Sequence, residues 1–152
     1  VGALALPTTG PVYLDAQVLI YSVEAHPVYA PVLAPLWAAV AAGQVGVMTS
    51  QLAVLEYLVL PLRSGNAALV ARYDQFVQTV GVRFAPVTEA ILRSAAQLRA
   101  TIPRLKTPDA IHAATAAAHG AGARNGAGSF RGIRFRRSWG GGGRPRPRKL
   151  GR

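Results

Sequence analysis

The sequence predicts a single α/β domain with a central, mostly parallel sheet, and two observations lead to this class. Short β-prone segments alternate with helix-like segments along residues 12–119, and only a few residues connect each pair. Parallel strands need crossover connections, which helices usually provide, so this alternation is typical of a mostly parallel sheet covered by helices. The total length of 152 residues fits one domain and excludes a second full one.

The first strand and helix are expected near the N-terminus of this domain. Residues 12–15 (VYLD) form a β-prone run, and residues 16–23 continue it as the end of the strand or as a helical turn; we interpret them as a strand followed by a helical turn. Apolar residues recur at helical spacing over residues 27–42, where two prolines are expected to start or bend the helix.

Residues 45–48 form the second predicted strand, and a helix follows to about Leu62, with the Ser50 hydroxyl as its N-cap. The apolar positions of this helix fall three and four residues apart, at Leu52, Leu55 and Val59. Glu56 interrupts the long apolar run, and a carboxylate near the middle of a membrane-spanning helix is costly. We therefore expect a buried strand and helix here, and no membrane span.

The second half of the chain supplies one more strand and two helices before residue 101. Asn66 is expected to cap a helix that ends at Gly81, because glycine readily adopts the left-handed conformation that closes helices. Residues 82–86 form the third predicted strand, and Thr88 caps a helix to about Ala100.

The last predicted helix begins at Thr107-Pro108-Asp109 and ends at His119. The Thr107 side chain is expected to cap it, and Pro108 fits the first helical position, where a backbone N–H is not required. The carboxylate of Asp109 suits the positive end of the helix dipole.

Charge is distributed very unevenly. The net charge of the chain is +11. Residues 1–120 hold 7 basic and 6 acidic side chains, whereas residues 121–152 hold 10 basic side chains and no acidic one. The second segment also contains 9 of the 16 glycines. We expect a domain over residues 1–120 and a basic Gly/Arg/Pro-rich tail over 121–152 that is largely disordered, because such a composition buries little apolar area.

Three of the six carboxylates lie in apolar surroundings: Asp15 ends the first strand, Glu56 lies within a helix, and Asp109 begins the last helix. Buried carboxylates are costly unless they are paired or hold a cation. The chain contains no cysteine and no histidine cluster, so oxygen ligands point to Mg²⁺ or Mn²⁺ instead of zinc. Such an ion suits phosphodiester hydrolysis.

Each of these residues also has a purely structural interpretation. Asp15 would cap the following helical turn, Asp109 would complement the helix dipole, and Glu56 would be solvated or paired with an arginine. His112, three residues after Asp109, is interpreted as an ordinary polar helix residue, with a place beside Asp109 as the alternative. The other carboxylates are interpreted as surface charges: Glu24, Asp74 and Glu89.

Three segments, in this order, together resemble the PIN domain, and most of all the VapC-type ribonuclease toxins of bacterial toxin–antitoxin pairs. They are residues 12–21 (VYLDAQVLIY), 49–56 (TSQLAVLE) and 106–116 (KTPDAIHAATA). The resemblance covers about residues 10–120. It implies an α/β/α sandwich with a parallel sheet, metal-dependent endonucleolytic cleavage of RNA, a homodimer, and a small antitoxin protein as inhibitor.

The resemblance also implies roles for individual residues. Asp15, Glu56 and Asp109 match acidic residues of the family's metal site, so we take them as catalytic and metal-binding candidates for Mg²⁺ or Mn²⁺. Thr49 and Ser50 match the polar start of the Glu56 helix, where capping alone is a sufficient role.

Two departures from the family pattern stand out. Gln17 occupies a position where relatives usually carry Asn or Ser. Relatives also carry a fourth acidic residue after the last helix, whereas residues 123–133 (ARNGAGSFRGI) contain none and no acid follows Asp109. The C-terminal strand region is therefore atypical, and weaker metal binding and lower activity are expected.

The leading hypothesis is a metal-dependent endoribonuclease that hydrolyses RNA phosphodiester bonds. The alternatives are a catalytically degenerate PIN domain that binds a protein or RNA, and a nucleic-acid binder that acts through the ten positive charges of residues 121–152. The absence of cysteine and of a recognisable secretory signal leads us to expect a cytoplasmic protein.

Overall fold

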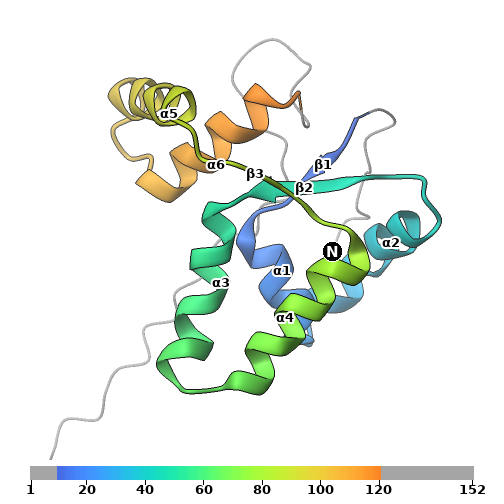
Figure 1. The fold of residues 1–152 in the computed structure, drawn as a ribbon. Helices are drawn as coiled ribbons and strands as arrows, with labels where there is room; N and C mark the ends of the chain where they lie inside the picture. The colour runs from blue at the N-terminus through green and yellow to red at the C-terminus, as the bar shows by residue number, and fades with distance from the viewer. Residues whose placement is uncertain (1–9, 121–152) are drawn as a thin grey trace, which may run out of the picture.

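A computed structural model describes residues 10–120 as helices packed on both sides of a three-stranded sheet (Figure 1). The strands β1 (Val12–Tyr13), β2 (Val47–Ser50) and β3 (Arg83–Ala85) are all parallel and lie in the order β1–β2–β3. The predicted α/β class with a parallel sheet is therefore confirmed. The predictions for the basic tail and for the atypical C-terminal strand region concern residues 121–152, which lie outside the described residues.

The helices of the described segment bring side chains to both faces of this sheet. They are α1 (Ala16–Val23), α2 (Tyr29–Ala41), α3 (Leu52–Arg63), α4 (Ala67–Val80), α5 (Glu89–Thr101) and α6 (Thr107–Ala118). The first four lie on one side of the sheet, and α5 and α6 lie on the other (Figure 1). None of the helices found between residues 10 and 120 is both long enough and apolar enough to cross a bilayer.

Most predicted helix limits agree with the structure because their caps form as expected. The Asn66 side chain accepts a hydrogen bond from Leu69 N at 3.0 Å, and Gly81 closes α4 with a φ of 69°. Thr88 Oγ1 accepts a hydrogen bond from Ile91 N at 3.3 Å at the start of α5. One segment differs: residues 16–23 form a complete helix of eight residues and no strand end.

Two predicted caps were wrong. Ser50 is the last residue of β2, so Gln51 takes the N-cap position of α3, although the Ser50 hydroxyl still accepts a hydrogen bond from Leu52 N at 3.2 Å. Thr107 is the first residue of α6 and not its cap; Lys106 takes the N-cap position, and the Thr107 hydroxyl accepts a hydrogen bond from Arg99 Nη1 at 2.8 Å.

The alternation of side chains along β1 divides the core between the two faces of the sheet. Val12 and Leu14 pack with α1–α4 in one cluster, whereas Tyr13 joins Met48 and Ala116 on the face that α6 covers. Tyr13 is thereby directed at α6. This direction matters for the site described below.

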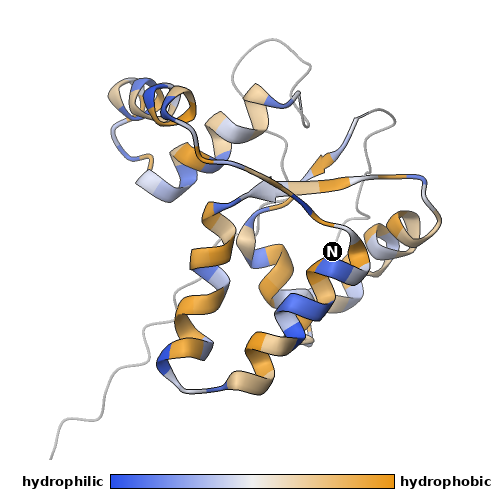
Figure 2. Cartoon of the chain, in the orientation of Figure 1, coloured by the Kyte–Doolittle hydropathy of each residue, from blue (hydrophilic) through white to orange (hydrophobic). Residues whose placement is uncertain are grey.

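Helix α3 buries a different face from the one its apolar spacing predicts. Its buried residues are Ala53, Tyr57 and Pro61, whereas Leu55 and Val59 are 63% and 42% exposed. The Tyr57 ring stacks on a tyrosine of α4 with the ring centroids 4.8 Å apart, and this contact lies on the buried face of α3. Hydrophobic residues consequently occur on the outward side of α3 as well as on the inward side (Figure 2).

The buried tyrosines predict a loss of stability in alkali. Burial raises the pKa of Tyr13 and Tyr73 above the ordinary value of 10.0, and a hydrogen bond to Glu24 raises that of Tyr73 further. Above about pH 10 the unfolded chain therefore loses phenolic protons that the folded chain keeps. The free energy of unfolding should be insensitive to these groups below that pH and then fall by about 1.4 kcal/mol per pH unit for each tyrosine.

Urea denaturation on both sides of about pH 10 measures this effect. Burial also raises the pKa of Tyr57, so Tyr73→Phe removes one of three such groups. Its stability should therefore fall less steeply above that pH than the stability of the unmodified chain. An equal dependence on pH in both proteins would contradict the assignment.

Candidate metal centre

Asp15 follows β1 after one intervening residue, Leu14, and is the N-cap of α1. Its backbone is extended (φ −74°, ψ 152°), and its Oδ1 accepts a hydrogen bond from Gln17 N at 3.4 Å. The side chain is half-buried. The helix-capping interpretation is therefore correct for Asp15, and it does not exclude a second role, because a carboxylate can accept several hydrogen bonds or hold an ion. Gln17 contributes here through its backbone N–H.

Glu56 comes from the second turn of α3, beside the buried face of that helix. Its side chain is only 12% exposed, and its Oε2 lies 2.7 Å from His112 Nε2. The partner predicted by the structural interpretation was solvent or an arginine. The structure gives Glu56 a histidine partner instead.

His112 is the functional candidate that sequence reasoning missed. We interpreted it as an ordinary polar helix residue, but its side chain is only 4% exposed. Its Nε2 contacts Glu56, and its Nδ1 lies 2.7 Å from the Tyr13 hydroxyl. One sequence signal is informative in retrospect: His112 is embedded in a run of small apolar residues on α6, and such a run indicates a buried helix face.

These side chains form one cluster. Single ligand atoms of Asp15, Glu56 and His112 all lie within 4.8 Å of one another. They come from three elements, because Asp15 begins α1, Glu56 lies on α3 and His112 lies on α6. Two carboxylates and an imidazole this close together offer donor atoms that could hold a divalent cation.

Asp109 lies in the first turn of α6, three residues before His112, and is half-buried. The structure thus brings Asp15 and Glu56 together, as the sequence predicts, and in residues 10–120 the third member of the close cluster is His112 instead of Asp109. Asp109 occupies the turn of α6 next to the cluster.

The polar residues at the start of the Glu56 helix are fully buried. Thr49 Oγ1 donates a hydrogen bond to the Leu14 carbonyl at 2.7 Å, which ties β2 to the residue that precedes Asp15. Ser50 bonds Leu52 N. Both residues therefore support the backbone around the cluster.

The remaining carboxylates are exposed, as predicted. Glu89 pairs with Arg93 at 2.7 Å in an exposed pair, and such pairs contribute little to stability. Glu24 accepts a hydrogen bond from the Tyr73 hydroxyl at 2.7 Å. Asp74 lies on the exposed side of α4.

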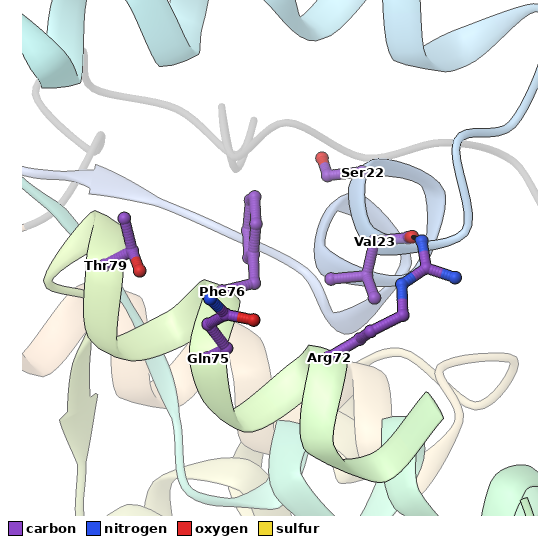
Figure 3. Close-up of a pocket in the computed structure, with 6 residues that line it drawn as sticks. All are labelled: Ser22, Val23, Arg72, Gln75, Phe76 and Thr79. Carbon is purple, nitrogen blue, oxygen red and sulfur yellow. Dashed lines mark hydrogen bonds between the residues drawn. The ribbon is translucent and has the colours of Figure 1, made fainter. Parts of the chain in front are cut away.

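A separate pocket of about 310 Å³ opens between α1 and α4 (Figure 3). The Arg72 guanidinium reaches across it to donate a hydrogen bond to the Val23 carbonyl. None of its lining residues is acidic: they are Ser22, Val23, Arg72, Gln75, Phe76 and Thr79. The pocket is therefore distinct from the carboxylate cluster, and we assign it no part in metal binding.

Comparisons with known proteins support one family. The chain is similar in structure to the crystal structure of VapBC2 from Rickettsia felis bound to a DNA fragment from their promoter, with a TM-score of 0.59 and 15% identity over 74% of this chain and 84% of that chain. At this identity the likeness shows the fold. The comparison with curated proteins gives no match. The family model described as PIN domain matches residues 12–123, most of the chain, and the chain therefore belongs to the PIN-domain family.

Proposed function

We propose that this chain is a metal-dependent endoribonuclease of the VapC toxin type, which hydrolyses RNA phosphodiester bonds. The observation that carries the proposal is the meeting of Asp15 and Glu56 beside the carboxyl end of β1, in a chain of the PIN-domain family. In parallel sheets this end is where ligands usually bind.

The chemistry of the cluster favours a cation. Asp15 and Glu56 would repel each other in a half-buried place unless a positive charge balanced them. We propose that Asp15, Glu56 and Asp109 hold Mg²⁺ or Mn²⁺ and are the catalytic residues, with Asp109 approaching from the first turn of α6. A divalent ion bound there would lower the pKa of the attacking water and neutralise charge on the phosphodiester.

We further propose an antitoxin protein as partner, a homodimer as the assembly, and the cytoplasm as the location. The neighbouring structure is a VapBC2 complex, which supports a protein partner. The exposed apolar side chains of α3 also support one, because a cluster of such residues on a helix is typical of protein interfaces. They are Leu55, Val59, Leu60 and Leu62.

One observation favours a second candidate function. No acidic residue follows Asp109 anywhere in the chain, so the fourth carboxylate of the family is missing. A PIN domain without catalytic activity would bind its protein or RNA partner and leave the RNA intact.

The test is RNA cleavage by the full chain, free of any partner, with Mg²⁺, with Mn²⁺ and with a chelator. We expect cleavage with either ion and none with the chelator. Asp15→Asn should abolish it, whereas Asp74→Asn, which alters an exposed aspartate of α4, should not. Activity no higher than that of Asp15→Asn would refute the nuclease and favour the binding module.

A chain that ends at Gly120, assayed in parallel, tests the contribution of the basic residues. RNA binding that survives the truncation belongs to the domain. Binding that disappears while cleavage of short RNA persists belongs to residues 121–152.

A further inference from the structure

The interior of this domain contains a small polar cluster in an otherwise apolar core. In the described residues the buried polar side chains are Thr49, Ser50, His112 and Thr115. They lie around Tyr13: His112 contacts its hydroxyl directly, and hydrogen bonding to the side chains of Thr49 and Thr115 and to the backbone of Ser50 lowers its pKa, against the larger effect of burial. Burying four polar side chains is costly unless each finds a partner, and no buried side-chain N or O atom in residues 10–120 lacks one.

Two hydrogen bonds of 2.7 Å join this polar cluster to the metal centre. The Tyr13 hydroxyl contacts Nδ1 of His112, and Nε2 of the same ring contacts Oε2 of Glu56. The Tyr13 and His112 rings also meet edge to face, with centroids 5.9 Å apart and planes at 72°. The His112 ring is therefore fixed by a hydrogen bond at each nitrogen and by the ring contact with Tyr13.

The chemistry of the partners determines which atom donates. An ionised carboxylate only accepts, so Nε2 of His112 carries the proton and donates to Glu56. In the neutral ring Nδ1 then accepts, and the Tyr13 hydroxyl donates to it. If the ring is charged, both nitrogens donate and the bond to Glu56 remains. The contact with Glu56 is thus the same in either protonation state.

A hydrogen bond from His112 restricts the Glu56 side chain. That side chain has three rotatable bonds, and ordering a glutamate costs conformational entropy. A carboxylate has two oxygens, so a hydrogen bond at Oε2 is compatible with coordination of an ion by Glu56.

We propose that His112 is a positioning residue, which fixes the Glu56 carboxylate for a divalent ion and is itself oriented by the Tyr13 hydroxyl. The inference rests on the proposed function, because it takes Glu56 as a metal ligand. Both ring nitrogens of His112 already have a hydrogen-bond partner: Nδ1 contacts the Tyr13 hydroxyl and Nε2 contacts the Glu56 carboxylate. Direct coordination of the ion by His112 is therefore not needed to explain its position. Outer hydrogen-bonding partners of this kind commonly change metal affinity by about 10- to 100-fold.

The experiment is calorimetric titration of Mn²⁺ into the full chain, with thermal melting of each variant in chelator to report folding. His112→Ala should weaken Mn²⁺ binding about 10- to 100-fold. His112→Gln should restore most of the affinity, because its amide N–H can still donate to Glu56 while being a poor metal ligand. Tyr13→Phe keeps the ring but releases Nδ1, so its affinity should fall between these two.

His119→Ala is the matched control, since His119 is an exposed histidine at the C-terminal end of the same helix, and its Mn²⁺ affinity should equal that of the unmodified chain. Undiminished binding by a folded His112→Ala, or binding by His112→Gln as weak as by His112→Ala, would overturn the positioning role. The second result would mean that the imidazole coordinates the ion directly. If the unmodified chain binds no Mn²⁺, the proposed function fails together with this inference.

Discussion

Replacing Glu56 by glutamine is expected to lower metal-dependent RNA cleavage about 100-fold or more while the domain stays folded. Loss of an outer partner of a metal ligand already costs about 10- to 100-fold, and this change removes the charge of a ligand itself. Glutamine has the same length, and its carbonyl can still accept the hydrogen bond from His112 Nε2. The measurement is the cleavage rate with Mg²⁺ or Mn²⁺, together with the melting temperature in chelator.

Glu89→Gln serves as the control for that experiment. Glu89 is an exposed glutamate of α5 whose ion pair with Arg93 lies at the surface, so the substitution removes an equal charge away from the cluster. We expect cleavage by Glu89→Gln to match that of the unmodified chain. Equal rates for Glu56→Gln and Glu89→Gln would show that Glu56 takes no part in catalysis.

Leu14→Ala is expected to cost about 2–5 kcal/mol in the free energy of unfolding. Leu14 is completely buried between the sheet and α1–α4, and its removal leaves a cavity that rigid neighbours cannot fill. Its backbone is fixed on both sides, because its N–H donates to Met48 O at 2.8 Å and its carbonyl accepts from Thr49. Such a backbone has little freedom to collapse into the cavity.

Urea denaturation of the metal-free protein measures this loss. Leu92→Ala on α5 is the matched control, since Leu92 is 46% exposed and surface substitutions usually change stability by less than about 0.5 kcal/mol. Similar stabilities of the two variants would mean that Leu14 is not part of the core that holds Asp15 in place.

The elements that could be predicted from the sequence are those whose ends are determined locally. Asn66, Gly81 and Thr88 act through hydrogen bonds or backbone angles within a few residues, and the structure confirms all three. The prediction of the buried face of α3 was wrong because that face depends on a contact with a residue distant in the sequence. Tyr57 packs against Tyr73 on another helix, and no local spacing reports that packing.

The candidate site shows the same division. Asp15 at the end of a strand and Glu56 in an apolar helix can be recognised in the sequence as charged residues in apolar surroundings. The structure brings them together. His112 was missed, because a polar residue on a helix is usually exposed and only the packing of α6 against Tyr13 and Met48 makes this one buried. The pattern of α6 cannot show which strand will face it.

The hydrogen bond between Tyr13 and His112 joins residues 99 positions apart. A ribosome that adds about 5–20 residues per second needs roughly 5–20 s to travel from one to the other. Glu56 is made 56 residues before His112, so for roughly 3–11 s of that interval it has no His112 to hold it, however early β1 and α3 are made. The centre is therefore completed only when the last described helix emerges, and a nascent chain that carries both carboxylates still lacks the residue that orients one of them.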